Sequence, residues 1–165
     1  FNNIKNSALS KYFRDNEVEM NKAVDNYLGY RCLQLKRQSI PKNGLIKNYT
    51  GKSLIAGFKI VNETSYNYYI KMYDVASGKL AITAFVRANT TTIFNVPLGN
   101  YIVKTAGGKD WYGYKDLFGH FTFYEKEEQP FDFYIRGNYI VGKAFEIQKS
   151  AYGNLKTTDI SANDF

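Results

Sequence analysis

The fold class is decided by residues 66–87, YNYYIKMYDVASGKLAITAFVR. Residues 66–74 and 80–87 are rich in aromatic and β-branched side chains, and Ala76-Ser77-Gly78 lies between them as a turn, so the stretch predicts a β-hairpin. Ile70 and Met72 alternate with tyrosines and a lysine, which predicts one buried face and one tyrosine-rich face. Fifteen tyrosines and twelve phenylalanines in 165 residues also favour strands over a helix bundle.

Further strands are predicted on both sides of this hairpin. The segment after it has a turn at residues 97–100, and Gly137-Asn138 is a two-residue hairpin signal. No second long helical pattern follows residue 45, so a parallel sheet is not expected. We therefore predict a mainly β domain, an antiparallel β-sandwich of about eight strands. The additional predicted strands are residues 54–61, 92–96, 101–106, 121–125, 131–136, 139–148 and 155–160.

The N-terminal quarter has a helical period instead. From Ser7 to Gln38 apolar residues recur every three, four or seven positions, and Pro41 and Gly44 end the pattern. We expect a helical arm and linker over residues 1–44, followed by the sandwich over residues 45–165. The apolar stripe predicts packing on the sandwich, with homo-oligomerisation or a stalk below a membrane anchor as the alternative. Its members are Leu9, Phe13, Met20, Val24, Tyr27, Leu28, Cys32 and Leu35.

Composition excludes several classes of protein. No apolar run reaches the length of a membrane span. The chain begins at Phe1 rather than Met and has no signal-peptide pattern, so we expect a processed protein or an excised fragment; a membrane tether or an export signal upstream of residue 1 is compatible with either. Cys32 is the only cysteine and His120 the only histidine, which excludes an internal disulfide, a CxxC pair and the usual zinc patterns. No metal or cofactor is expected.

The net charge of +7 is concentrated in one segment, residues 31–52, which contains no acid between its cations. Such a run can attract nucleic acid or an anionic membrane. A solvated linker is the simpler interpretation, because a pI near 9.3 is only moderately basic. Nucleic-acid binding by the tyrosine- and lysine-bearing strands is disfavoured as well, because cross-strand packing explains such tyrosines and no RNP-type motif is present. The six basic residues are Arg31, Lys36, Arg37, Lys42, Lys47 and Lys52.

Residues 107–120 fit neither periodicity, although they contain the only tryptophan, the only histidine and several glycines. A loop so rich in aromatic side chains either packs onto the core or receives a ligand, because aromatic faces stack on sugars, bases and cations. We keep both interpretations, a core-closing loop and a binding loop. The candidate ligand-binding residues are Trp111, Tyr112, Tyr114 and Phe118, with Lys109 and Lys115 complementing an anionic partner.

An enzyme is not predicted. His120 has Asp110 and Asp116 nearby in sequence, but no serine or cysteine nucleophile accompanies it. Glu127 and Glu128 lie in a Lys-Glu-Glu-Gln-Pro stretch, which we expect to be a solvated turn, and nothing sets a pair of carboxylates at a catalytic separation.

Two resemblances to known groups of proteins accompany these patterns. The segment from Val96-Pro97 through Gly99 to Tyr101 resembles the hairpin of prealbumin-like, carboxypeptidase-regulatory-like sandwiches, in which an inward tyrosine opens a strand. Residues 41–155, with Trp111-Tyr112-Gly113 and Phe118-Gly119, resemble a group of bacterial and prophage-encoded proteins without an assigned activity. That resemblance implies a domain that follows a transmembrane helix or another module, a bacterial cell-envelope location with the cytoplasm as the alternative, and no catalytic residue.

These observations together predict a non-enzymatic binding or assembly module that contacts a protein or cell-envelope partner through the loop of residues 107–120. The alternative is a charge-driven binder of nucleic acid or anionic membrane through residues 31–52.

Overall fold

The computed structural model describes residues 35–147 and 157–165, and the chain divides into two compact units, residues 1–36 and 37–165. The boundary between the units falls eight residues before the one predicted at 44. The predicted helical arm, with Arg31 and Cys32, lies almost entirely outside the described residues. Within the described ranges, no helix has the length and apolar character needed to cross a bilayer.

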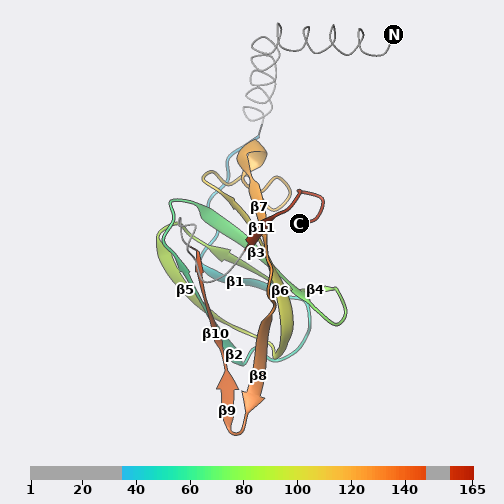
Figure 1. The fold of residues 1–165 in the computed structure, drawn as a ribbon. Helices are drawn as coiled ribbons and strands as arrows, with labels where there is room; N and C mark the ends of the chain where they lie inside the picture. The colour runs from blue at the N-terminus through green and yellow to red at the C-terminus, as the bar shows by residue number, and fades with distance from the viewer. Residues whose placement is uncertain (1–34, 148–156) are drawn as a thin grey trace, which may run out of the picture. The chain divides into compact units, whose positions relative to one another are not determined.

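The second unit is mainly β, as predicted, and its strands form two sheets (Figure 1). The larger sheet has the order β1-β4-β3-β6-β7-β11, and β8 also pairs with β6 and carries β9. The smaller sheet has the order β10-β2-β5. The described strands are β1 (Gly44–Asn48), β2 (Ala56–Asn62), β3 (Asn67–Asp74), β4 (Leu80–Val86), β5 (Thr90–Val96), β6 (Gly99–Gly108), β7 (Phe123–Glu127), β8 (Phe131–Arg136), β9 (Tyr139–Val141), β10 (Lys143–Ile147) and β11 (Thr157–Asp159).

The predicted hairpin of residues 66–87 is confirmed as the antiparallel pair β3–β4, and the Gly137-Asn138 turn is confirmed between β8 and β9. The expectation of entirely antiparallel pairing was wrong at one place, because β10 pairs with β2 in parallel. Parallel pairing needs a long connection between the two strands rather than a helix as such, and residues 63–142 supply it. The strand predicted over residues 139–148 is broken at Gly142, where the chain passes from β9 to β10.

The β6 strand positions a loop at one of its ends and a hairpin at the other. One edge of β6 pairs with β3, and the other edge pairs with β8 near Gly99 and with β7 near Gly107. The loop between β6 and β7 therefore leaves one end of β6, and the β8–β9 hairpin (residues 131–141) leaves the other end.

The main core lies between the two sheets. Phe58 of β2 is its centre, with its ring 5.4 Å from the rings of both Phe131 and Phe133. Such edge-to-face and tilted aromatic pairs stabilise a core beyond simple area burial. The other large, fully buried members include Ile60, Ile70, Met72, Ile82, Val86, Val96 and Tyr101.

A second core covers the opposite face of the larger sheet. Phe85 of β4 and Tyr69 of β3 pack there against Trp111 from the β6–β7 loop and Phe165 near the end of the chain. The alternation predicted along β3 therefore gives two covered faces at this point, because Tyr69 on the tyrosine-rich face is buried as well. Because β4 is covered on both faces, its sequence Leu80–Val86 is almost continuously apolar instead of alternating.

Candidate binding loop

The β6–β7 loop (residues 109–122) is held by backbone hydrogen bonds. The Tyr112 amide donates to the Leu117 carbonyl at 2.7 Å, and the Leu117 amide donates to the Gly113 carbonyl at 2.7 Å. The N-terminal side of the domain adds two bonds: the Gln38 amide donates to the Trp111 carbonyl and its Nε2 donates to the Tyr112 carbonyl, at 2.8 and 3.0 Å. The loop is thus tied to a distant part of the chain.

Trp111 and Phe118 form the underside of this loop. Trp111 is only 2% exposed, and its ring lies 5.2 Å from the rings of both Phe85 and Phe118. A Cβ added at Gly108 would lie 2.2 Å from Cβ of Phe118, so the glycine lets this ring approach the sheet. In this arrangement neither aromatic side chain is available to a ligand.

Tyr114 is placed differently from those two residues. Its ring touches Trp111 at 5.3 Å between centroids, yet 56% of the side chain is exposed. Tyr112 is half-buried, whereas Lys109 and Lys115 are exposed. The four predicted aromatic residues therefore divide into an inner pair, an intermediate Tyr112 and an outer Tyr114.

Sequence reasoning missed one residue of this loop surface. Phe121 was expected to open a strand, but a 3-10 turn at Gly119–Phe121 delays β7 to Phe123 and leaves the Phe121 side chain largely in solvent. In the sequence, Gly119 was the available indication of a turn at this point. In the structure this glycine has a positive φ, which other residues rarely adopt.

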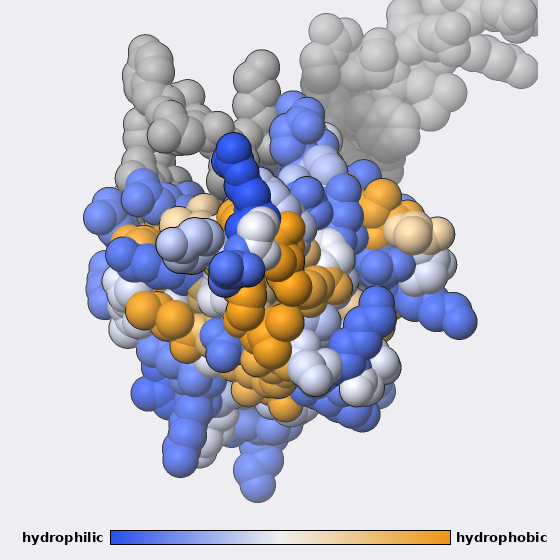
Figure 2. Space-filling view, turned by 90° about the horizontal axis from the view of Figure 1, so that it is seen from below, coloured by the Kyte–Doolittle hydropathy of each residue, from blue (hydrophilic) through white to orange (hydrophobic). Residues whose placement is uncertain are grey.

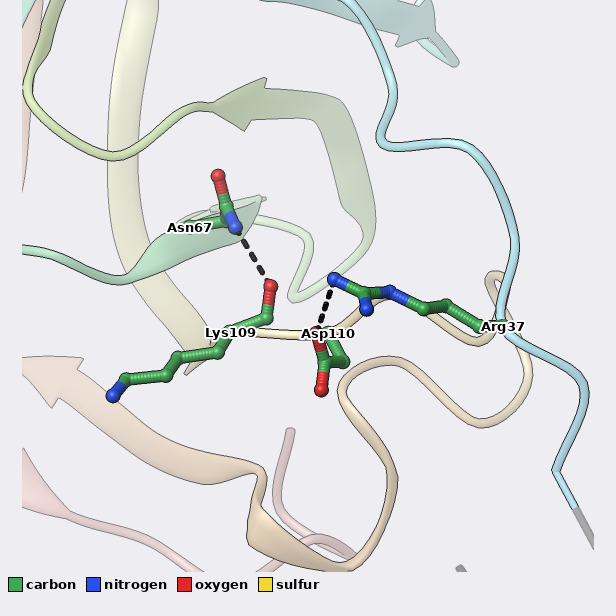
Figure 3. Close-up of polar contacts among 4 residues, drawn as sticks. All are labelled: Arg37, Asn67, Lys109 and Asp110. Carbon is green, nitrogen blue, oxygen red and sulfur yellow. Dashed lines mark hydrogen bonds and ion pairs between the residues drawn. The ribbon is translucent and has the colours of Figure 1, made fainter. Parts of the chain in front are cut away.

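The charges beside the loop are partly compensated. Arg37 forms a 2.5 Å ion pair with Asp110, and the pair contributes little to stability because the Arg37 side chain is largely and the Asp110 side chain partly in solvent (Figure 3). Lys109 is fixed through its backbone, because Asn67 Nδ2 donates to its carbonyl at 3.0 Å. Its ammonium group points away from the Arg37–Asp110 pair and lies 5.7 Å from the Tyr66 ring.

The predicted basic patch does not gather at one place in the described residues. Its five described members are all exposed, but they are spread along the segment: only Lys47 lies in β1, three members precede that strand and Lys52 follows it. Arg37 lies at the β6–β7 loop, the Lys47 ammonium lies over the Tyr49 ring, and Lys52 is close enough to Asp74 to help lower its pKa, after the larger effect of hydrogen bonds from Ser77.

The candidate acid–base residues are also separated. His120 is exposed with its ring against Phe121, and within the described ranges no hydrogen bond links it to Asp110 or Asp116. The expectation of a solvated Glu127 was wrong, because the residue lies in β7 and is only 1% exposed. Burial, and then the charges of Glu125 and Glu128, raise its pKa to about 7.

Within the same described ranges, no cluster of three His, Cys, Asp or Glu residues is suited to a metal ion. Glu128, by contrast with Glu127, is exposed as expected and accepts a hydrogen bond from Thr158.

No family model, curated protein or solved structure matches this chain. The local feature behind the prealbumin-like resemblance is present, since Tyr101 is fully buried and its hydroxyl donates to the Leu98 carbonyl at 3.2 Å. A single turn does not identify a family, and both resemblances stay predictions.

Proposed function

We propose that residues 37–165 form a non-enzymatic binding or assembly module whose anionic partner contacts the outer surface of the β6–β7 loop. The outer surface is defined by Tyr112, Tyr114, Lys115 and Phe121. This interpretation combines the two left open by the sequence: the inner half of the loop completes the second core, and the outer half meets the partner.

The observation that carries the proposal is the pairing of a fixed base with an exposed aromatic tip. Trp111 and Phe118 hold the loop from below, and the hydrogen bonds to Gln38 hold its backbone. A surface held in one conformation loses little entropy on binding. Tyrosine presents a large amphipathic ring at low entropic cost, and the adjacent Lys115 favours negative charge.

The partner class follows from these groups. An aromatic ring beside a lysine suits an acidic protein surface or an anionic cell-envelope polymer with flat sugar faces. The cell-envelope setting rests on the resemblance to bacterial and prophage-encoded proteins, and a cytoplasmic setting remains the alternative.

Trp111 supplies the test, because it is the only tryptophan and its ring touches Tyr114. Its fluorescence is followed while cell-wall oligosaccharides, single-stranded DNA and anionic vesicles are titrated in turn, each at low and high salt. We expect a saturable change with one class of ligand, because a ligand on Tyr114 alters the environment of the tryptophan below it.

A matched pair of variants gives the control. Tyr114→Ala with Lys115→Glu should abolish the change, whereas Tyr49→Ala with Lys47→Glu, an exposed tyrosine–lysine pair on the basic segment, should leave it intact. The reverse result, with a steep loss of binding in salt, would assign function to residues 31–52 instead. No change with any ligand would contradict the loop proposal.

A further inference from the structure

The β8–β9 hairpin is the part of the domain where the chain crosses from the larger sheet to the smaller one. Its base is fixed in the main core, where Phe131 and Phe133 are buried against Phe58. At the other side of the base, a Cβ on Gly142 would lie 2.4 Å from the Gly57 carbonyl oxygen, so the two backbones touch. The hairpin is therefore held where both sheets meet.

Beyond that base the hairpin is a two-stranded ribbon that projects from the body of the domain (Figure 1). Residues 134–136 of β8 pair only with β9, in the register Ile135 opposite Ile140 and Arg136 opposite Tyr139. Gly137, with a φ of +60°, begins the two-residue turn. An isolated two-stranded ribbon is marginal in water, so its exposed apolar residues gain little from the fold itself.

Apolar side chains lie on both faces of this ribbon. Ile135 and Ile140 are 54% and 47% exposed on the face that continues from Phe133, and Tyr139 is 78% exposed on the other face beside Arg136. Figure 2, which views the domain from this end, shows apolar side chains gathered near the centre of the face, with a strongly hydrophilic side chain among them and further hydrophilic ones around them. Four of the ten exposed large hydrophobic side chains of the described residues therefore lie on this one hairpin.

The shape and charge of the ribbon indicate what kind of partner it contacts. Full burial of its four large apolar side chains, Tyr134 included, would remove on the order of 400 Å² from water, about half of what one partner contributes to a standard protein interface. Apolar groups on two opposite faces are buried together by a medium that surrounds the ribbon. Residues 134–143 contain Arg136 and Lys143 and no acid, which complements anionic lipid headgroups.

We propose that the β8–β9 hairpin inserts its tip into the interfacial region of an anionic membrane. The Tyr139 ring enters first, at the tip, and Ile135 and Ile140, one residue behind it, reach the acyl boundary. The long Arg136 side chain extends back to the phosphates, and Tyr134, nearer the domain, lies at headgroup level. The proposed partner-binding loop lies at the other end of β6, so membrane contact leaves it accessible.

Co-sedimentation of the full chain with vesicles tests the proposal. The vesicles consist of phosphatidylcholine alone or of phosphatidylcholine mixed with phosphatidylglycerol, and the variants are Ile135→Ser with Ile140→Ser and, as matched control, Ile93→Ser, an isoleucine of β5 that is 68% exposed. We expect binding to the anionic vesicles, a partition coefficient lowered at least about tenfold in the hairpin variant, and no change in the control.

A second measurement places the tip in the bilayer. Tyr139→Trp adds a tryptophan whose emission, after subtraction of the Trp111 signal, should shift to the blue and be quenched by brominated lipid, whereas Ile93→Trp should show neither effect. Equal partition of wild type and hairpin variant would place membrane binding elsewhere in the chain and overturn the proposal. Absence of binding to both vesicles, or loss of a self-associated form instead of lipid binding, would overturn it too.

Discussion

The regions at the two ends of β6 bury their large apolar side chains to very different extents. At the Gly108 end, Trp111 and Phe118 fold back onto the sheet and become a second core with Phe85 and Tyr69. At the Gly99 end, the β8–β9 hairpin continues past the main core and leaves Ile135, Ile140 and Tyr139 in solvent. Similar side chains therefore stabilise the fold in one region and are free for contact with other molecules in the other.

The difference comes from what covers each region. The face above Tyr69 and Phe85 is closed by three segments distant in sequence: Ile40, the β6–β7 loop and Phe165. Phe165 is held by hydrogen bonds from Tyr73 and Lys71 to its carbonyl. Nothing comparable in the described residues covers the β8–β9 tip, which pairs only with itself. Burial here is decided by tertiary coverage rather than by residue type.

The largest expected effect is the loss of the indole at the packed end. Trp111→Ala should lower the free energy of unfolding by about 3–5 kcal/mol, because it removes a buried aromatic side chain and leaves a cavity beside Phe85 and Phe118. Urea unfolding followed by circular dichroism measures the change.

Tyr114→Ala is the control for that experiment. Because the Tyr114 side chain is mostly exposed, this substitution should lower the free energy of unfolding by less than about 1 kcal/mol. Equal losses for the two variants would mean that the inner and outer halves of the loop are not energetically distinct.

The pH dependence of stability tests whether the carboxyl group of Glu127 is buried. This residue lies in β7, the strand that follows the packed loop. Its folded pKa of about 7 lies above the ordinary value of a glutamate, so the folded state holds a proton that the unfolded state has released. The contribution of Glu127 to the free energy of unfolding should therefore be fully present below about pH 4.5 and be lost as the pH rises through 7, by up to about 3 kcal/mol. Glu125, whose pKa is raised by burial and then by the charge of Asp159, acts in the same direction.

Glu127→Gln should remove most of this slope and be more stable than wild type at pH 8, as measured by urea unfolding at several pH values. Glu128→Gln, on an exposed neighbour, should keep the slope. A wild-type protein whose stability is flat between pH 4.5 and 7 would show that the Glu127 carboxylate is solvated after all.

Most of the fold could be predicted from the sequence, because periodicity and turn residues are local signals. The β3–β4 hairpin, β8 over residues 131–136 and the Gly137-Asn138 turn all follow from them. The strand β1 could not, since Gly44–Asn48 lies in a basic segment and owes its conformation to pairing with β4.

The candidate site was predictable only as a region. Glycine and aromatic content marked residues 107–120, but which rings turn inward depends on Gln38, Phe85 and Phe165, none of which is close in sequence. Glu127 shows the same limit, because a Glu-Glu-Gln-Pro stretch is polar in composition while its position in β7 places one carboxyl group inside.

Two glycine substitutions test the same contrast between the ends of β6, with smaller expected effects on stability. Gly108→Ala should cost about 1–3 kcal/mol, because the new methyl group would collide with the Cβ of Phe118, which cannot move without disturbing the second core. Gly137→Ala meets no atom within 4 Å and should cost about 1 kcal/mol from its positive φ alone. Thermal unfolding of both variants measures the difference, and a larger cost at Gly137 would contradict the assignment of a tightly packed loop and an open hairpin.

The smallest expected effect on stability is at the hairpin tip, and it is the most informative about function. Tyr139→Ala should change the free energy of unfolding by less than about 0.5 kcal/mol, because the side chain stands in solvent at a ribbon end and supports no core residue. If urea unfolding shows this small change and vesicle binding falls in the same variant, Tyr139 contributes to membrane binding and not to the stability of the fold. A loss of several kcal/mol would instead mean that Tyr139 is packed against the domain in solution, and the two ends of β6 would then be alike.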